Sequence, residues 1–242
     1  MAIVKVDIEK LLELGAHFGH QNRRWNPKME DYIYGLKDGV RVFDLVKTVS
    51  ALEKALAVVT EASKGGKVIL FVGTKKQIKD KIKEVGLATG CPYVDLRWLG
   101  GTLTNFEQIR RSIRRMGEMK EAQKEGKYKD RTKKERLLID REIEKMDKRF
   151  GGISGLESLP DLMIIFDIHR ENSALREANF KKVDTVGIVD SNSDPSLVTW
   201  PVPMNDDAAG ALEYVLDLFK EAVMAGRKSP ARKAASGKLK KK

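Results

Sequence analysis

The fold is decided by the run Val68-Ile69-Leu70-Phe71-Val72, which is followed directly by Gly73-Thr74-Lys75-Lys76. Five consecutive apolar residues leave no polar face, which is typical of a strand buried on both sides in a parallel sheet. Gly73 turns the chain, and a helix is predicted over residues 75–88. Because a strand that leads into a helix begins a βαβ unit, the sequence predicts an α/β domain.

The same alternation continues on both sides of this run. A helix is expected to begin at a capping box formed by Ser50 and Glu53 and to end at Gly65-Gly66. Asp38-Gly39 lies between two β-rich segments, residues 32–34 and 40–43, and predicts a hairpin. Further strands are expected at residues 93–96, 162–166, 185–189 and 198–202, and further helices at residues 7–14, 173–180 and 206–225. The pattern indicates an open parallel sheet with helices on both faces.

Residues 104–150 break this pattern, because the segment is too long and too charged for an ordinary crossover helix. Apolar residues recur at heptad spacing in both halves of the segment. They are Phe106, Ile109, Ile113 and Met116, then Ile139, Ile143, Met146 and Phe150. Two capping boxes are expected, one formed by Thr104 with Glu107 and one by Thr132 with Glu135. The sequence predicts a protruding antiparallel coiled-coil hairpin with arms of about 30 Å, and the alternative is a helix pair packed on the domain.

Positive charge is concentrated in two outlying segments. The 242-residue chain has 46 Lys and Arg against 35 Asp and Glu, a formal net charge of +11. Residues 226–242 carry +8 and residues 105–150 carry +6, so the rest of the chain carries −3. A near-neutral platform with basic appendages indicates a polyanionic partner, either nucleic acid or an acidic membrane surface.

Composition excludes several other classes of protein. Hydrophobic residues make up 41% of the chain, which is enough for one sizeable α/β core or two small domains. Cys91 is the only cysteine, which excludes an intramolecular disulfide and a cysteine-based zinc site and favours the cytoplasm. The N-terminal residues show no signal-peptide pattern, and the apolar runs fall far short of the roughly 20 residues that span a bilayer.

Two loops and one arm of the predicted hairpin hold candidate RNA-binding residues. The loops, residues 21–28 and 97–105, combine basic, amide and indole side chains, and arginine forks match phosphate groups. Trp25 is expected either to stack on a base or to pack beneath the arginines, and Trp98 to anchor the base of the hairpin. Either loop could also be purely structural. The candidates are Arg23, Arg24, Trp25, Lys28 and Arg97 in the loops and Arg110, Arg111, Arg114 and Arg115 on the arm.

The basic tail, residues 227–242, is a further candidate. It mixes Lys and Arg with Gly, Ser, Ala and Pro and has no hydrophobic pattern, so we expect disorder until it meets polyanion. The tail residues assigned to RNA are Arg227, Lys228, Arg232 and Lys233. Each phosphate contact steepens the loss of affinity by up to ~0.9 log unit for a tenfold increase in salt. Deleting the tail should therefore flatten the salt dependence of binding. A tail that serves only solubility would leave that dependence unchanged.

The rival hypothesis is a phosphate-ester or nucleotide enzyme. Gly73-Thr74-Lys75 at a helix N-terminus could bind phosphate. However, neither G-x-x-x-x-G-K-(S/T) nor G-x-G-x-x-G follows any of the expected strands. Four carboxylates could meet at the edge of the sheet and bind a hard cation such as Mg²⁺: Asp190, Asp194, Asp206 and Asp207. The alternative is that the first two shape a turn while Asp206 caps the last helix. A third hypothesis is a membrane-surface scaffold that uses the tail.

Histidines give only a weak metal signal. His17 and His20 lie three residues apart in a Gly-containing loop, where hydrogen bonding explains them more readily than zinc. The segment from Asp190 opens like a calcium loop, but Pro195 and Pro201 stand where such a loop needs Gly and Glu. No resident metal or other cofactor is therefore expected.

Several of these segments resemble the bacterial small-subunit ribosomal protein S-two family. The similar segments follow in order between about residues 10 and 215: HFGHQ (17–21), RWNPKM (24–29), FVGTK (71–75), RWLGGTLTNF (97–106), GIVDSNSDP (187–195) and NDDA (205–208). Residues 167–170 and the lysine-rich end depart from the family pattern. The resemblance implies a flavodoxin-like parallel α/β domain with a protruding helical hairpin. It also implies contacts with 16S ribosomal RNA and other small-subunit proteins, and docking of ribosomal protein S-one.

Taken together, these patterns predict an α/β domain formed by residues 1–103 and 151–226. A coiled-coil hairpin is inserted at residues 104–150, and a disordered basic tail follows at residues 227–242. With the resemblance, we expect a structural constituent of the small (30S) ribosomal subunit that supports translation in the cytoplasm. We expect no catalysis, no membrane partner and no small-molecule substrate.

Overall fold

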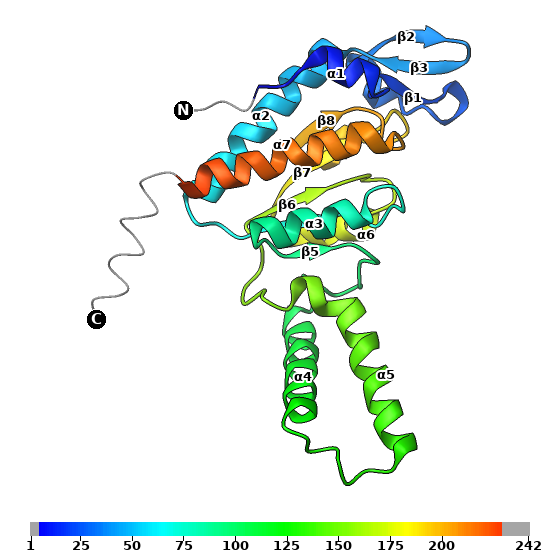
Figure 1. Cartoon of the computed structure of the whole chain (residues 1–242). Coiled ribbons are helices and arrows are strands. Elements are labelled where there is room, and N and C mark those ends of the chain that lie inside the picture. Colours follow the sequence, from blue (N-terminus) through cyan, green and yellow to red (C-terminus); the bar gives the residue numbers. More distant parts are fainter. Residues whose placement is uncertain (1–4, 229–242) are drawn as a thin grey trace.

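A five-stranded parallel sheet forms the centre of the molecule (Figure 1), in a computed structural model that describes residues 5–228. Its strands are β4 (Ile69–Val72), β5 (Tyr93–Val94), β6 (Leu162–Ile165), β7 (Asp184–Val189) and β8 (Trp200–Pro203). They lie in the order β5-β4-β6-β7-β8, and every pair is parallel. This is the 2-1-3-4-5 order of flavodoxin-like sheets, so the predicted fold class is confirmed.

Helices cover both faces of the sheet. One face carries α1 (Ile8–Glu13), α2 (Leu45–Lys64), α3 (Lys79–Thr89) and α7 (Ala209–Lys228), and the other carries α6 (Asn172–Lys181). Along β4, Ile69 and Phe71 point into the first layer, while Leu70 and Val72 point into the second. All four side chains are buried, as the uninterrupted apolar run predicts.

Three helices begin at least three residues away from their predicted starts. Helix α2 begins at Leu45 because Asp44, directly after a strand, accepts a hydrogen bond from the Val46 N–H; the expected capping box at Ser50 is wrong. Helix α3 begins at Lys79, so Lys75 lies in the preceding turn. Helix α7 begins at Ala209, so Asp206 does not cap it.

Helix α7 also extends three residues further than predicted, through Gly226 to Lys228. Gly226 packs against α2 so closely that a Cβ there would lie 2.5 Å from the Thr60 carbonyl oxygen. On the same contact, the Ser63 hydroxyl donates to the Val223 carbonyl at 2.7 Å. Arg227 and Lys228 therefore belong to a helix rather than to the tail.

An antiparallel sheet precedes the parallel one. It contains β1 (Phe18–Gln21), β2 (Ile33–Lys37) and β3 (Val40–Phe43) in the order β1-β3-β2. Asp38 and Gly39 have φ values of 52° and 78°, as a tight hairpin turn requires, so the predicted hairpin is confirmed. Strand β1 was expected to be loop. Short 3₁₀ helices are η1 (Asn22–Arg24), η2 (Pro27–Tyr32), η3 (Gly151–Ile153) and η4 (Pro195–Leu197).

Two long helices, α4 (Phe106–Lys124) and α5 (Lys133–Phe150), extend away from the parallel sheet (Figure 1). Arg115 contacts Glu142 at 2.8 Å across the pair, and Met116, Ile143 and Phe150 are buried. The capping box at Thr132 and Glu135 is present. The one expected at Thr104 and Glu107 is absent, since α4 begins after Asn105 without a side-chain cap. Coiled-coil packing of the arms, and the division of the chain into these domains, stay predictions.

None of the helices in residues 5–228 combines the length and apolar character of a membrane-spanning segment.

Candidate nucleic-acid interface

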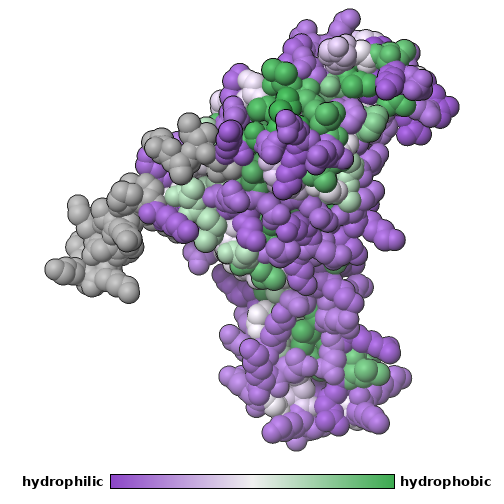
Figure 2. Space-filling model, turned by 45° about the horizontal axis from the view of Figure 1, so that its top comes forward, coloured by the Kyte–Doolittle hydropathy of each residue, from purple (hydrophilic) through white to green (hydrophobic). Residues whose placement is uncertain are grey.

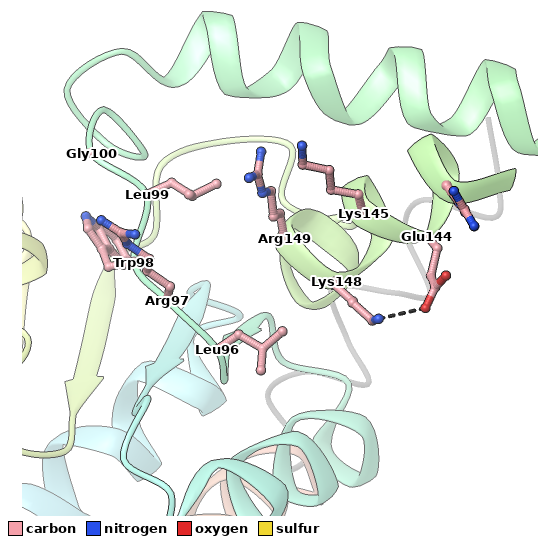
Figure 3. Close-up of a pocket in the computed structure, with 10 residues that line it drawn as sticks. Leu96, Arg97, Trp98, Leu99, Gly100, Glu144, Lys145, Lys148 and Arg149 are labelled. Atoms are coloured by element: carbon pink, nitrogen blue, oxygen red, sulfur yellow. Dashed lines mark hydrogen bonds and ion pairs between the residues drawn. The ribbon is translucent and has the colours of Figure 1, made fainter. Parts of the chain in front are cut away.

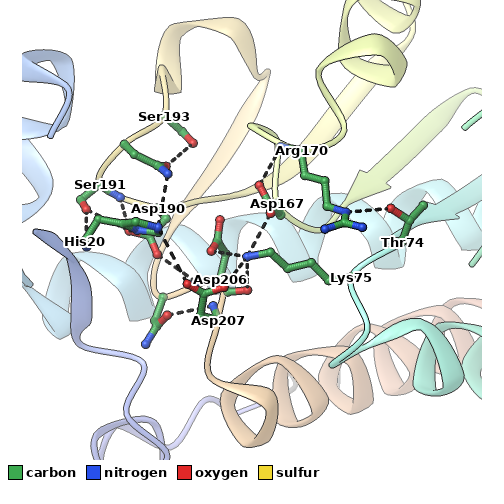
Figure 4. Close-up of polar contacts among 12 residues, drawn as sticks. His20, Thr74, Lys75, Asp167, Arg170, Asp190, Ser191, Ser193, Asp206 and Asp207 are labelled. Atoms are coloured by element: carbon green, nitrogen blue, oxygen red, sulfur yellow. Dashed lines mark hydrogen bonds and ion pairs between the residues drawn. The ribbon is translucent and has the colours of Figure 1, made fainter. Parts of the chain in front are cut away.

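Buried carboxylates gather at the carboxyl edge of the parallel sheet, around one lysine (Figure 4). The Lys75 ammonium lies 2.6 Å from Asp206, 2.7 Å from Asp207 and 3.0 Å from Asp167. Asp190 joins the cluster because its Oδ2 accepts the Asp206 N–H at 3.1 Å. The ammonium therefore takes the central position that a hard cation was expected to occupy.

Asp194, the fourth carboxylate of the expected magnesium set, lies outside this cluster. It pairs with Lys28 at 2.6 Å and accepts the Ser196 N–H at the start of η4, so it shapes the turn, as the structural alternative expects. His20, in contrast, lies in the cluster, with Nδ1 3.0 Å from Asp190 Oδ1. His20, Asp190 and Asp206 offer ligand atoms within 4.8 Å of one another and could hold a metal ion; His17 is not among them.

Two groups of the cluster, Asp206 and His20, have raised pKa values. Burial, with the charges of Asp190 and Asp167, raises the pKa of Asp206 to about 7. The hydrogen bond to Asp190 raises the pKa of His20, against the opposing effect of burial. Each group therefore binds a proton more tightly in the folded chain than in the unfolded chain.

We expect the free energy of unfolding to fall as pH rises from about 4 to about 7. In the unfolded chain Asp206 is ionised over most of this range, whereas the folded chain keeps its proton up to about pH 7 and thus loses stability as pH rises. His20 acts in the same direction, because stability present below its unfolded pKa is lost as pH passes its raised pKa. Urea unfolding at several pH values measures the slope. Asp206→Asn should flatten it, and an unchanged slope in that variant would contradict the assignment.

In the turn after β4, the Thr74 groups that could donate to a phosphate already donate to a carboxylate. The Thr74 N–H and hydroxyl both donate to the Glu171 carboxylate, at 3.2 Å and 2.5 Å, and Arg170 donates to the same hydroxyl at 3.1 Å. Glu171 is buried, and burial raises the pKa of its carboxyl group. A phosphate here would displace this carboxylate and face the neighbouring aspartates. The geometry therefore disfavours the nucleotide-enzyme hypothesis.

The loop at residues 21–28 is held in place by Arg41 of strand β3. The Arg41 guanidinium lies 3.9 Å from the centre of the Trp25 ring and donates to the Asn22 side chain at 2.9 Å. Trp25 thus packs beneath an arginine, but the partner is Arg41, which the sequence did not indicate. Arg23 and Arg24 are exposed and have no ion-pair partner among the described residues, whereas Lys28 is held by Asp194.

The loop at residues 97–105 is held by one carboxylate. Glu177 on α6 accepts hydrogen bonds from the Trp98 indole at 3.0 Å, the Gly101 N–H at 2.8 Å and the Leu103 N–H at 2.9 Å. The Thr104 N–H and hydroxyl donate to it at 3.0 Å and 2.9 Å. Burial opposes the effect, but these donors lower the pKa of Glu177 overall. Sequence analysis missed Glu177 because its partners lie more than 70 residues away along the chain.

The arm candidates fall into two groups. Arg115 is paired with Glu142, and Arg110 lies 4.0 Å from Glu107. Arg111 and Arg114 are exposed and have no ion-pair partner in the described part of the chain. Figure 1 places these arms and the β1 region, with its adjoining loop, at opposite ends of the molecule, so the candidates form separate surfaces.

The tail candidates are only partly described. Arg227 donates to the buried Cys91 sulfur at 3.3 Å, and Lys228 is exposed in the last turn of α7. Arg232 and Lys233 lie outside the described residues. The five-stranded parallel sheet with two long helices that extend away from it defines the class of the protein as a flavodoxin-like α/β domain with a helical extension.

Comparison with known proteins identifies the family. The family model for ribosomal protein S2 matches residues 11–226. Small ribosomal subunit protein uS2 of Rhodospirillum centenum is 46% identical, over 93% of this chain and 87% of its own length. The proteins of the same name from Coprothermobacter proteolyticus and Prochlorococcus marinus are 42% and 41% identical, over 92% and 93% of this chain and 83% and 96% of their own lengths.

The chain therefore belongs to the ribosomal protein S2 family, as the resemblance predicts. This is a family of ribosomal structural proteins rather than of enzymes, and its members work on the ribosome in the cytoplasm.

Proposed function

We propose that the chain is a structural constituent of the small ribosomal subunit that binds 16S ribosomal RNA and neighbouring proteins. The relatives' names point to the small subunit. The observation that carries RNA binding is that five of the arginines expected to contact RNA are exposed and have no ion-pair partner among the described residues. These five are Arg23, Arg24, Arg97, Arg111 and Arg114.

The distribution of these cations suits a folded polyanion. They lie on loops and on a helical arm, while the sheet edge neutralises its own carboxylates with Lys75. Figure 2 shows that the exposed surface of the two arms is mostly hydrophilic. The planar guanidinium of arginine is pre-organised for phosphate, so less side-chain freedom is lost for each hydrogen bond formed. Phosphate contacts of this kind position a protein on RNA without reading its sequence.

Docking of ribosomal protein S-one is the finer part of the proposal. Support comes from the family resemblance and from exposed apolar side chains at the β2–β3 hairpin, where Tyr34 is 82% exposed and Leu36 53% exposed. An exposed apolar patch of this kind is suited to contact with protein rather than with phosphate. Particles assembled with Tyr34→Ser and Leu36→Ser should then contain less S-one, and an undiminished amount would exclude this docking surface.

Filter binding of the purified chain to 16S ribosomal RNA over a range of salt tests the RNA contact. Replacing both Arg111 and Arg114 with Ala should weaken binding and lower the salt slope by about 1 for each lost phosphate contact. The matched control replaces Lys54 and Lys83 with Ala, which removes the same charge from exposed positions on α2 and α3. Equal slopes for the two variants would contradict the role of the arm, and no binding by the unaltered chain would contradict RNA binding altogether.

A further inference from the structure

A hollow of about 510 Å³ lies between the loop that begins α4 and the side of α5 (Figure 3). One wall is the loop, residues 96–100, and the other is the second half of α5. We call this hollow the basic groove. Its polar and charged lining residues are Arg97, Arg141, Glu144, Lys145, Lys148 and Arg149.

The basic groove concentrates positive charge that sequence analysis did not single out. Arg141, Lys145, Lys148 and Arg149 follow at successive turns of α5 and therefore share one face of the helix. Arg97 lines the same hollow from the loop, and all five side chains are exposed. With Glu144 as the one acidic lining residue, the net charge of the lining is +4.

Four of the five cations of the basic groove have no internal ion-pair partner among the described residues. Lys148 pairs with Glu144 at 2.6 Å, but Arg97, Arg141, Lys145 and Arg149 have no ion-pair partner within the described residues. Some other cations of the arms are paired, for example Lys120 with Asp147 at 2.5 Å and Arg115 with Glu142 at 2.8 Å. Four unpaired cations around one hollow repel one another, so an anion that bridges them is stabilised.

The apolar lining of the basic groove limits what the ligand can be. Leu96 is 47% exposed and Leu99 is half-buried, so the loop wall offers aliphatic surface. Trp98 is buried and its indole N–H donates to Glu177, so it cannot serve as a stacking platform for a base. Cations beside aliphatic surface suit the phosphates and sugars of a nucleic-acid backbone, which would be bound without regard to sequence.

Both walls are fixed before a ligand arrives. Glu177 holds Trp98 and Gly101 of the loop, while Phe150 at the end of α5 is buried in the core. A hollow of this volume accommodates a small-molecule-sized unit such as one nucleotide. Because the walls are already held, binding would cost little ordering of the backbone.

We propose that the basic groove binds the phosphate backbone of an RNA strand and so fixes the base of the hairpin against the RNA. This inference rests on the proposed function and assigns to it a site on α5, distinct from the arginines of α4. Among the five cations of the groove, Arg97 alone was an RNA-binding candidate from the sequence.

The test compares two triple variants of the full chain. The groove variant carries Arg141→Ala, Lys145→Ala and Arg149→Ala. The control carries Lys133→Ala, Lys134→Ala and Arg136→Ala, which removes the same charge from exposed positions on the same helix. Alanine is a strong helix former, so both variants should keep the fold, and circular dichroism checks this. The groove variant should lower the salt slope of binding to 16S ribosomal RNA by about 2 to 3, and the control by less than 1.

Two further measurements keep the proposal falsifiable. A variant with Arg141→Lys and Arg149→Lys preserves the charge and should keep most of the salt slope. A photo-crosslinker attached through Lys145→Cys, selective because Cys91 is buried, should crosslink to RNA in assembled particles.

Failure of this proposal can be told apart from failure of the proposed function. If the unaltered chain binds the RNA but the two triple variants have equal slopes, the groove assignment is overturned while RNA binding stands. Crosslinking only to protein would also overturn it and would indicate an acidic protein segment as the occupant. If the unaltered chain does not bind the RNA, both proposals fall together.

Discussion

Replacing Glu177 with Ala should lower the free energy of unfolding by about 3 to 5 kcal/mol, because a single carboxylate satisfies five donors of the loop at residues 98–104. Leu103 is buried, so its N–H would lose its partner without access to water. Hydrogen bonds to a charged acceptor contribute about 1.5 to 3 kcal/mol each, but neighbouring bonds are not additive. Urea unfolding gives the value.

The same variant should also loosen the base of the hairpin. In Glu177→Ala, hydrogen exchange at the Gly101, Leu103 and Thr104 amides should accelerate. Amides in the centre of β6 should lose only the protection that corresponds to the fall in global stability. Glu213→Ala is the matched control, since Glu213 is an exposed helical glutamate with no ion-pair partner among the described residues. If both variants were equally stable, Glu177 would not be the anchor of this loop.

The second large effect is expected at Lys75. Burial alone would lower the pKa of its ammonium group, but the hydrogen bonds and charges of Asp206, Asp207 and Asp167 raise it, so the group stays charged in the folded chain. Lys75→Met would leave these carboxylates without their shared cation. Removing one partner of a buried ion pair typically costs about 3 to 5 kcal/mol, and the 57% exposure of Asp207 places this case toward the lower end.

The neighbouring Lys76 provides the control for that experiment. Lys76 is exposed and has no ion-pair partner among the described residues, so Lys76→Met should change stability by less than about 0.5 kcal/mol. Adding Asp207→Asn to Lys75→Met should restore part of the loss, because the pKa of Asp207 is lowered, so this carboxylate is ionised and the change removes one uncompensated charge. A double variant no more stable than Lys75→Met alone would show that the two groups are not coupled.

The fold was accessible from the sequence because its signals are local. The apolar run at Val68 to Val72 and the Asp38-Gly39 turn each specify a conformation within a few residues, and the structure contains both. The order of the strands came instead from the family resemblance, since five parallel strands are compatible with several orders. The flavodoxin-like order in the structure agrees with that expectation.

The contacts within the sites could not be predicted, because they join residues far apart in the chain. Thr104 looks like a helix cap in the sequence, yet it donates to Glu177, which leaves the start of α4 without a side-chain cap. Asp194 looks like a partner of Asp190, yet Lys28 binds it instead. In each case a distant side chain competes successfully for a group whose local pattern suggests another role.

The positions of charged residues can be read from the sequence, but their ion-pair partners cannot. Counting gives the net charge of a whole segment, but it does not show which cations are already neutralised. Arg115 has a partner on the facing arm, whereas Arg141 and Lys145 have none among the described residues. Cations without an internal partner are the ones best placed to bind an external anion, and these include residues that no sequence pattern distinguishes.

The central claim is that this chain grips a large folded RNA through cations on the outlying parts of a near-neutral platform. Its most direct test is sedimentation of small ribosomal subunits, purified from cells that contain the chain, through gradients of increasing salt. We expect about one copy per subunit at low salt and progressive release as phosphate contacts are screened. If the chain instead stayed at the top of the gradient at low salt, apart from the subunits, the claim would be contradicted.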